Sequence, residues 1–206
     1  MSEFMNVVRE RRSANKFLEG IQIPKEDFEW IFKEISLAPS AFNLQHAHYY
    51  VVTDQEKMME MHEGAFKQYK IKTASATIIV TGDKHAYQQA NKIYEGSKML
   101  GILDQTEYNH IIDMITNLYE GWGEPFKHDE AVRNASLSAM MFLLLAKEKG
   151  WDTCPMIYFD QDKIRESLNI PEHEVPVLMI TMGKMDQKSN KIRGYRKPAA
   201  EFVKYI

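Results

Sequence analysis

The sequence predicts an α+β protein in which a small mixed sheet is covered by a majority of helices. Three runs of strand length, YYVVT (49–53), ATIIVTG (76–82) and VPVLMITMG (175–183), are almost continuously apolar. Such runs are typical of strands that are covered on both faces. The intervening segments are long and amphipathic, but too few strands are evident for a doubly wound sheet. Because no internal repeat, linker or low-complexity stretch interrupts the pattern, we expect one domain over residues 1–206.

The first part of the chain is predicted to form two helices and then a break. Residues 3–11 can form a short helix with an apolar face. Pro24, with two acidic residues in the following turn, opens a second helix that runs to about Leu37. The segment Ala38-Pro39-Ser40 breaks that helix before the first strand. Asp54 follows this strand and is expected to cap the next helix.

The middle of the chain is predicted to be helical on both sides of one loop. Residues 84–121 have the pattern of two polar amphipathic helices, and the segment GWGEPF (121–126) predicts a loop. A further helix is expected from Asp129 to the stop signal at Gly150. Its centre, SLSAMMFLLLA, is apolar nearly all round, which indicates burial in a core or between subunits.

The last quarter of the chain is predicted to finish the sheet and to leave an arm. WDTCPMIYF (151–159) is expected to be extended, and residues 160–169 suit a short helix before the third strong strand. The tail from residue 184 is polar at first and apolar at its end. We expect that apolar end to pack on another surface.

Composition excludes several classes of protein. The formal net charge is −3 with no long basic run, so nothing predicts a nucleic-acid partner. Cys154 is the single cysteine, so an intrachain disulfide is impossible and a reducing compartment is expected. The N-terminus has no apolar signal core, and the longest apolar run, Leu137 to Ala146, is too short to span a bilayer. We therefore expect a cytoplasmic protein without a membrane partner.

Several patterns that carry chemistry are absent or weak. The dinucleotide fingerprint G-x-G-x-x-G and the P-loop are both missing. His46 and His48 would share one face of a strand, but no third ligand is nearby, so we expect a polar strand edge and no metal site. No histidine is placed to activate Cys154, which suits a small buried apolar residue better than a nucleophile. Glu172 and Glu174 are explained by a solvated turn.

Two polar clusters allow more than one interpretation. Arg11 and Arg12, followed by Ser13, could clamp a phosphate, because the planar guanidinium matches phosphate oxygens. Spacing alone favours a solvated helix end, where positive charge also complements the helix dipole. The same alternatives apply to five other cations, which are Lys67, Lys70, Arg193, Arg196 and Lys197. The cluster Pro39, Ser40 and Asn43 contains turn-forming residues first and ligand contacts second.

The order of these segments is similar to that of a known family. The carriers are RRSANKF (11–17), LAPSAFNLQHAHYYVV (37–52), ATIIVTGD (76–83), RNASLSAMMFLLLAKEKGWDTCPMIYFD (133–160) and GYRKPAAEFV (194–203). Together they resemble the nitroreductase family of FMN-dependent oxidoreductases over almost the whole chain. The resemblance is strongest to the bacterial NAD(P)H nitroreductases of the quinone or methylhydroquinone response.

The resemblance implies a nitroreductase-like fold and an intertwined homodimer, with FMN at the subunit interface and the C-terminal tail as an arm over the neighbour. Arg11, Ser13 and Arg196 would face the phosphate and the ribityl chain. The Pro39–Asn43 segment would come from the partner chain, and a backbone N–H of Ile157 or Tyr158 would reach flavin N5. The full set around the flavin would be Arg11, Arg12, Ser13, Asn15, Pro39, Ser40, Ala41, Asn43, Lys67, Lys70, Asn134, Leu137, Pro155, Met156, Ile157, Tyr158 and Arg196.

Two positions depart from the family pattern. Asn15 stands where the family usually has Lys or Arg, which would steady negative charge at the N1–O2 side of the flavin. Tyr158 stands where the family often has Gly, which lets the backbone approach the ring closely. The side chain of Tyr158 is expected to narrow the site.

The implied activity is electron transfer from NAD(P)H through flavin N5 to a quinone or nitroaromatic acceptor, with ping-pong kinetics because one face serves both substrates. Lys70 would stabilise the reduced flavin, and Tyr119, Trp122 and Phe126 are candidates for an acceptor pocket. A helix pair simply packed on the core would explain the same three aromatic residues. The alternatives are a flavin-binding protein without turnover, flavin fragmentation, dehalogenation or a catalytically empty dimer. The choice between NADH and NADPH stays open.

Overall fold

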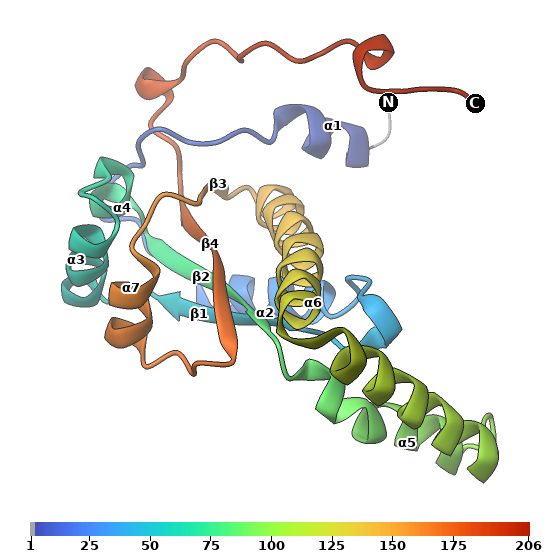
Figure 1. Ribbon diagram of the computed structural model, residues 1–206. Helices are drawn as coiled ribbons and strands as arrows, with labels where there is room; N and C mark the ends of the chain where they lie inside the picture. Colours follow the sequence, from blue (N-terminus) through green and yellow to red (C-terminus); the bar gives the residue numbers. More distant parts are fainter. Residues whose placement is uncertain (1–2) are drawn as a thin grey trace.

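A computed structural model describes residues 3–206 (Figure 1). A four-stranded sheet with the order β1-β2-β4-β3 forms its centre. The strands are β1 (Ala47–Val52), β2 (Ala76–Asp83), β3 (Asp152–Met156) and β4 (Glu174–Gly183). The helices are α1 (Glu3–Glu10), α2 (Lys25–Ile35), α3 (Gln55–Gly64), α4 (Tyr69–Thr73), α5 (Ala90–Met99), α6 (Gln105–Glu148) and α7 (Gln161–Leu168). The α+β prediction is confirmed.

The direction of the strands corrects the expectation of a mixed sheet. All three strand pairs are antiparallel. Val52, the last residue of β1, lies opposite Thr77 near the start of β2, so the α3–α4 connection returns the chain at the same end of the sheet. In the described residues, parallel pairing occurs only as an isolated bridge between Ser13 and Thr153.

Helices cover the sheet on both sides, which explains why every residue of β2 is buried (Figure 1). On one side, Ile31 of α2 and Phe142 of α6 pack against Ile78. On the other side, residues of α3, α4 and α7, such as Met61 and Ile164, form a second cluster with strand residues of β2 and β4. A sheet covered on both faces needs apolar residues in both alternating positions, as the continuous runs indicated.

The loop expected over residues 121–126 is reduced to one non-helical residue, Gly123, between the two parts of α6. Helix α6 begins with a capping box, in which Asp104 Oδ1 accepts from the Glu107 N–H at 2.8 Å and Glu107 Oε2 accepts from the Asp104 N–H at 2.9 Å. One kink interrupts it at Gly123, whose φ of 71° is easily reached by glycine, and Pro125 follows within the helix. Residues Gln105–Glu148 are therefore two helices that meet at Gly123, so the break predicted within residues 121–126 is confirmed there, and the second helix begins before the predicted start at Asp129.

The second half of α6 approaches the sheet closely and only partly fulfils the prediction of burial. A Cβ atom added to Gly82 would lie 2.3 Å from the Ala131 carbonyl oxygen, so this crossing requires glycine. The inner face of the apolar stretch, including Phe142, is buried. Leu137 and Met140 on its outer face remain about half exposed in the single chain.

The tail after β4 runs back alongside α1 (Figure 1). From Asn190 to the last residue every side chain is exposed, including the apolar Phe202 and Tyr205. The expected surface for this apolar end is therefore not supplied by the tail's own chain. Among residues 3–206, no helix combines the length and the apolar character that crossing a membrane requires.

Candidate functional site

The segment with the paired arginines is attached to the end of the sheet. The Ala14 N–H donates to the Thr153 carbonyl at 3.0 Å, beside the bridge between Ser13 and Thr153. Ala14 and Phe17 are buried and anchor the segment. This attachment places the RRS stretch next to β3.

The tail closes over the same segment through side-chain contacts in both directions. The Arg12 guanidinium donates to the Lys191 carbonyl, and Asn15 Nδ2 donates to the Ser189 carbonyl at 3.4 Å. In return, the Arg193 guanidinium donates to the carbonyls of Arg9 and Arg11. A pocket of about 210 Å³ results, lined by Arg11, Arg12, Ser13, Asn15, Lys191, Ile192, Arg193, Gly194 and Arg196.

The charge of this pocket suits a phosphate. Its lining contains four arginines and one lysine and no carboxylate. Burial, followed by repulsion from Arg193 and Arg196, lowers the pKa of Arg11, although Cys154 opposes this shift. Guanidinium groups bind dianionic phosphates with charge-assisted hydrogen bonds. The residues present therefore fit the phosphate of FMN.

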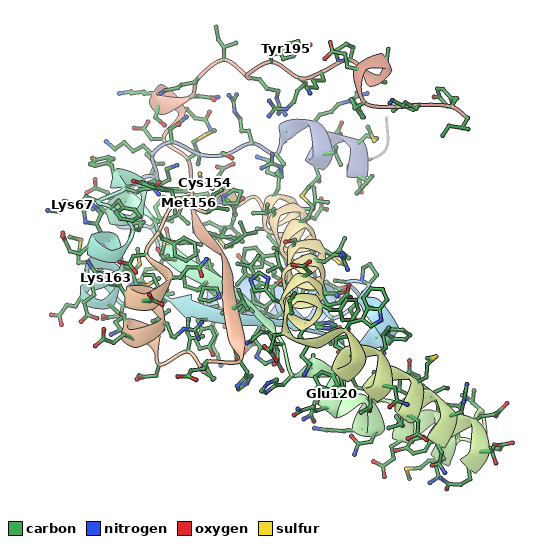
Figure 2. The ribbon with its side chains drawn as sticks, viewed as in Figure 1. Lys67, Glu120, Cys154, Met156, Lys163 and Tyr195 are labelled. Atoms are coloured by element: carbon green, nitrogen blue, oxygen red, sulfur yellow. The ribbon has the colours of Figure 1, made fainter. Side chains whose placement is uncertain are left out.

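Lys70, but not Lys67, reaches this end of the sheet. Lys70 Nζ lies 3.2 Å from the Sγ atom of Cys154, which is buried as expected. Lys67 is exposed and pairs with Glu63 at 3.5 Å. Figure 2 shows Cys154 and Met156 together near the sheet, whereas Lys67 lies at the outer edge of the molecule.

The chain leaves the sheet after Met156 with its next side chains in solvent. Met156 is buried, and Ile157 and Tyr158 are exposed. Outside the sheet ladder, the described residues supply no hydrogen-bond acceptor for the backbone N–H groups of Ile157 and Tyr158. These two groups could therefore donate to a ligand.

The Pro39–Asn43 segment forms a separate, internally bonded group with Asn134. Asn134 Oδ1 accepts from the Ala41 N–H at 2.7 Å, and Asn134 Nδ2 donates to the Glu130 carbonyl at 2.7 Å. Phe42 and Asn43 have φ angles of 50° and 54°, an uncommon backbone shape for residues other than glycine. The structure thus brings Asn134 to the loop as its anchor.

A second pocket lies beside this loop. It has a volume of about 160 Å³, and its lining includes Pro39, Ser40, His46, Asn134 and Ser138 but no residue of the arginine-lined pocket. His46 is buried, and burial lowers its pKa to about 4, so the ring is neutral near pH 7. Its Nε2 lies 3.1 Å from the Tyr119 hydroxyl, and its Nδ1 has no hydrogen-bond partner within residues 3–206.

The three aromatic residues expected to form an acceptor pocket have different environments. Tyr119 is buried and stacks on Tyr87 with ring centroids 4.9 Å apart. Trp122 is exposed, and its ring lies 5.0 Å from that of the half-buried Phe126. All three belong to the part of α6 that projects from the sheet. Figure 2 shows its neighbour Glu120 far from Cys154 in the same chain.

The sequence interpretation missed a buried carboxylate. Glu174 was expected in a solvated turn, but it is buried and accepts hydrogen bonds from Tyr50, at 3.0 Å, and Thr81. His48 Nδ1 lies 2.9 Å from the same carboxylate. The alternation of His48 and Tyr50 along a strand was the available signal, because both side chains must point to one face of the sheet. The exposed pair of Phe66 and Tyr158 was also missed, because it depends on a contact between distant segments.

Comparison with known proteins identifies the class of protein that this fold and site define. The pattern of the nitroreductase family matches residues 8–184, and the chain belongs to this family. The family uses FMN with NAD(P)H as the electron donor, which makes its members oxidoreductases.

Three relatives show how far the similarity extends. MhqN of Bacillus subtilis, assigned as an NAD(P)H nitroreductase, is 54% identical over the full length of both chains. The crystal structure of YdfN of Bacillus subtilis, assigned as a nitroreductase, has a TM-score of 0.97 and 53% identity over 99% of each chain. A protein of Exiguobacterium sibiricum, assigned as a nitroreductase and solved in complex with FMN, has a TM-score of 0.90 and 27% identity, covering 100% of this chain and 98% of its own.

Proposed function

We propose that this protein is a cytoplasmic, homodimeric oxidoreductase that binds FMN and transfers electrons from NAD(P)H to quinones or nitroaromatics. The observation that carries the proposal is the carboxylate-free pocket lined by four arginines beside β3. The FMN complex of the relative from Exiguobacterium sibiricum supports the choice of anion. The family match over residues 8–184, together with the one sheet, supports a single domain.

The arginine-lined pocket would hold the phosphate end of FMN. Arg11, Arg12 and Arg196 supply charge, and Ser13 supplies a hydroxyl at the same wall. Asn15 lies in this wall too, but its amide already donates to the tail carbonyl of Ser189. Because Asn15 is neutral, it cannot supply positive charge to the ring of FMN. Lys70, whose Nζ donates to the thiol of Cys154, would be the cation next to the ring.

The end of β3 would receive the ring of FMN. When bound, FMN supplies the atom that accepts a hydride and later gives up electrons. Pro155 and Met156 back the site, and the N–H groups of Ile157 and Tyr158 would donate to flavin N5. Lys70 would stabilise negative charge on the reduced ring, which is the electrostatic contribution of the protein to catalysis.

A second copy of the chain would complete the site. The Pro39–Asn43 segment is shaped and bonded in advance by Asn134, yet its pocket shares no residue with the arginine-lined pocket. The exposed outer face of α6, with Leu137 and Met140, and the exposed apolar end of the tail both lack cover in the single chain. A two-fold dimer would cover both and would bring Pro39, Ser40, Ala41 and Asn43 of one chain to the arginines of the other. It could also deliver Trp122 and Phe126 to the open face as part of an acceptor pocket.

The test is a visible absorption spectrum of the purified protein, followed by titration without oxygen. We expect about one FMN per chain, because a two-fold dimer contains two equivalent sites. NADH or NADPH should bleach the flavin, and a quinone should restore its colour. With both substrates on one face, initial rates should give the parallel lines of ping-pong kinetics. A colourless protein that takes up no added FMN contradicts the proposal, and a flavin that neither nucleotide reduces supports binding without turnover.

A further inference from the structure

Two aromatic side chains from distant segments stack on each other in solvent. The ring centroids of Phe66 and Tyr158 are 4.4 Å apart with an interplanar angle of 29°. Yet 51% of the surface of Phe66 and 67% of that of Tyr158 remain exposed. A rigid aromatic pair that is open to solvent is suited to receive another flat ring, because offset stacking adds to the burial of apolar area.

The backbone around Phe66 holds the pair in an uncommon shape. Phe66 and Lys67 have φ angles of 50° and 58°, and such angles are unusual for a bulky residue. The turn is fixed by the Lys67 N–H, which donates to the His62 carbonyl at 2.9 Å. Gln68 Nε2 donates to the Tyr158 carbonyl at 2.8 Å and ties the two segments together. Strained positions that are held in this way are concentrated at functional sites.

The pair borders the proposed ring site. Tyr158 lies two residues beyond Met156, on the segment whose free N–H groups face the proposed flavin N5. Lys70, in the same turn region as Phe66, contacts Cys154 on that segment at 3.2 Å. The aromatic pair and the proposed cation of the ring site therefore belong to one connected structure, formed by residues 66–70 and 154–158.

We propose that Phe66 and Tyr158 form a subsite that binds the ring of an aromatic acceptor and determines the preference for such acceptors. This inference rests on the proposed function. The residue at position 158 decides the subsite, because a glycine there could not complete the stack. The pair contacts the acceptor and does not donate or accept the electrons.

The test uses the FMN-loaded protein with Phe66→Leu and Tyr158→Leu, which keep an apolar side chain and remove the ring. Tyr195→Leu is the matched control, because Tyr195 is an exposed tyrosine on the tail, and Figure 2 shows it away from Lys67, the residue next to Phe66, and from Met156. The acceptors are a two-ring naphthoquinone and ferricyanide, which takes electrons without a ring to stack. Calorimetry of naphthoquinone binding to the oxidised protein adds a measurement that is independent of turnover.

We expect each of the two substitutions to raise the Kd and the KM for naphthoquinone about 2- to 10-fold, from the usual strength of one aromatic contact. For Phe66→Leu and Tyr195→Leu, the rate with ferricyanide, the FMN content and the molecular mass in solution should stay at the wild-type values. For Tyr158→Leu, whose backbone N–H is assigned to flavin N5, the loss with naphthoquinone should exceed any loss with ferricyanide. Because the rings act as a unit, the double variant should lose little more than either single variant.

Three results would overturn the inference while the proposed function stands. They are unchanged naphthoquinone binding, an equal loss of rate with ferricyanide, and a change of mass that marks the pair as a subunit contact. A wild-type protein that holds FMN but gives no rate with ferricyanide and NAD(P)H contradicts the proposed function, and the inference fails with it.

Discussion

Two clusters of ionisable side chains lie at opposite ends of the sheet and have opposite properties. At the end where Thr153 pairs with Met182, the arginine-lined pocket collects positive charge without a carboxylate. At the end where Asp83 pairs with Glu174, the buried Glu174 is surrounded by donors from β1 and β2. The first cluster depends on a tail with exposed side chains, whereas the second belongs to the sheet itself.

The difference shows how a ligand site can be told from a structural ion pair. Burial disfavours the charged form of Glu174, but hydrogen bonds from His48 and Thr81 outweigh it and leave the pKa of Glu174 below its ordinary value. For Arg11, burial and the neighbouring Arg193 and Arg196 all act against the charge. A charge that is paired with donors or opposite charges within the chain stabilises the fold, and a cluster of like charges without a carboxylate among its lining residues is suited to an external anion.

The largest effect on stability should follow when the hydrogen-bonded cluster around Glu174 is broken. Glu174→Ala leaves two hydroxyl groups and His48 without their acceptor, so we expect the free energy of unfolding to fall by about 3 to 5 kcal/mol. Urea unfolding of the FMN-free protein at pH 6 measures this change in the free energy of unfolding. Glu172→Ala, two residues away and exposed, is the control and should stay within about 0.5 kcal/mol of the wild type. A loss below about 1 kcal/mol would show that the buried carboxylate is not needed by the fold.

Arg11→Ala should weaken FMN binding and leave the stability of the FMN-free protein almost unchanged. The described residues supply no hydrogen-bond acceptor for its guanidinium, so the stability of the FMN-free protein should change by less than about 0.5 kcal/mol. The loss of one charge-assisted contact to phosphate should raise the Kd for FMN about 10- to 100-fold. A fluorescence titration of free FMN with the FMN-free protein measures this Kd.

Lys197→Ala is the matched control for this prediction, because Lys197 is an exposed cation of the tail outside the lining of the pocket. Its Kd for FMN should stay close to that of the wild type. Equal affinity for FMN in the wild type and in Arg11→Ala would show that Arg11 does not bind the phosphate of FMN and that the arginine cluster is ordinary surface charge.

The comparison also shows what the sequence could predict. The three apolar runs predicted three of the four strands, and the signal is clearest in β2, where every residue is buried. Asp54 was correctly assigned as a cap, and its carboxylate accepts from the Lys57 N–H at 2.8 Å. The roles of Arg11 and Ser40 came from family resemblance alone, since isolated cations and turn residues have no distinctive spacing.

The errors share a physical origin in contacts between distant parts of the chain. Glu174 became buried because β1 and β2 bring donors to it, and no pattern near position 174 shows them. The break at Gly123 was predicted within the correct segment, but the loop was predicted too long, because helix-breaking residues do not reveal how soon the next helix begins. The same limit hid the stack of Phe66 on Tyr158, which are 92 positions apart in the sequence.

The smallest predicted effect is a pH dependence that belongs to His48 alone. The hydrogen bond to Glu174 raises the pKa of His48, although burial opposes it. A histidine whose pKa is raised in the folded state contributes stability that is fully present below its unfolded pKa of about 6.5. That contribution is lost as the pH rises through the folded pKa.

The measurement is the difference in unfolding free energy between the wild type and His48→Gln from pH 5 to pH 9. Because 47% of the His48 side chain is exposed, solvent screens the pair, and the difference should shrink by only about 1 kcal/mol or less as the pH rises above 7. His46, with its pKa lowered to about 4 by burial, titrates in both proteins and cancels in the difference. Tyr50, whose pKa is raised to about 12, stays neutral throughout. A difference that stays constant over this range would mean that protonation of His48 contributes nothing to stability and that the neutral ring makes its contact with Glu174.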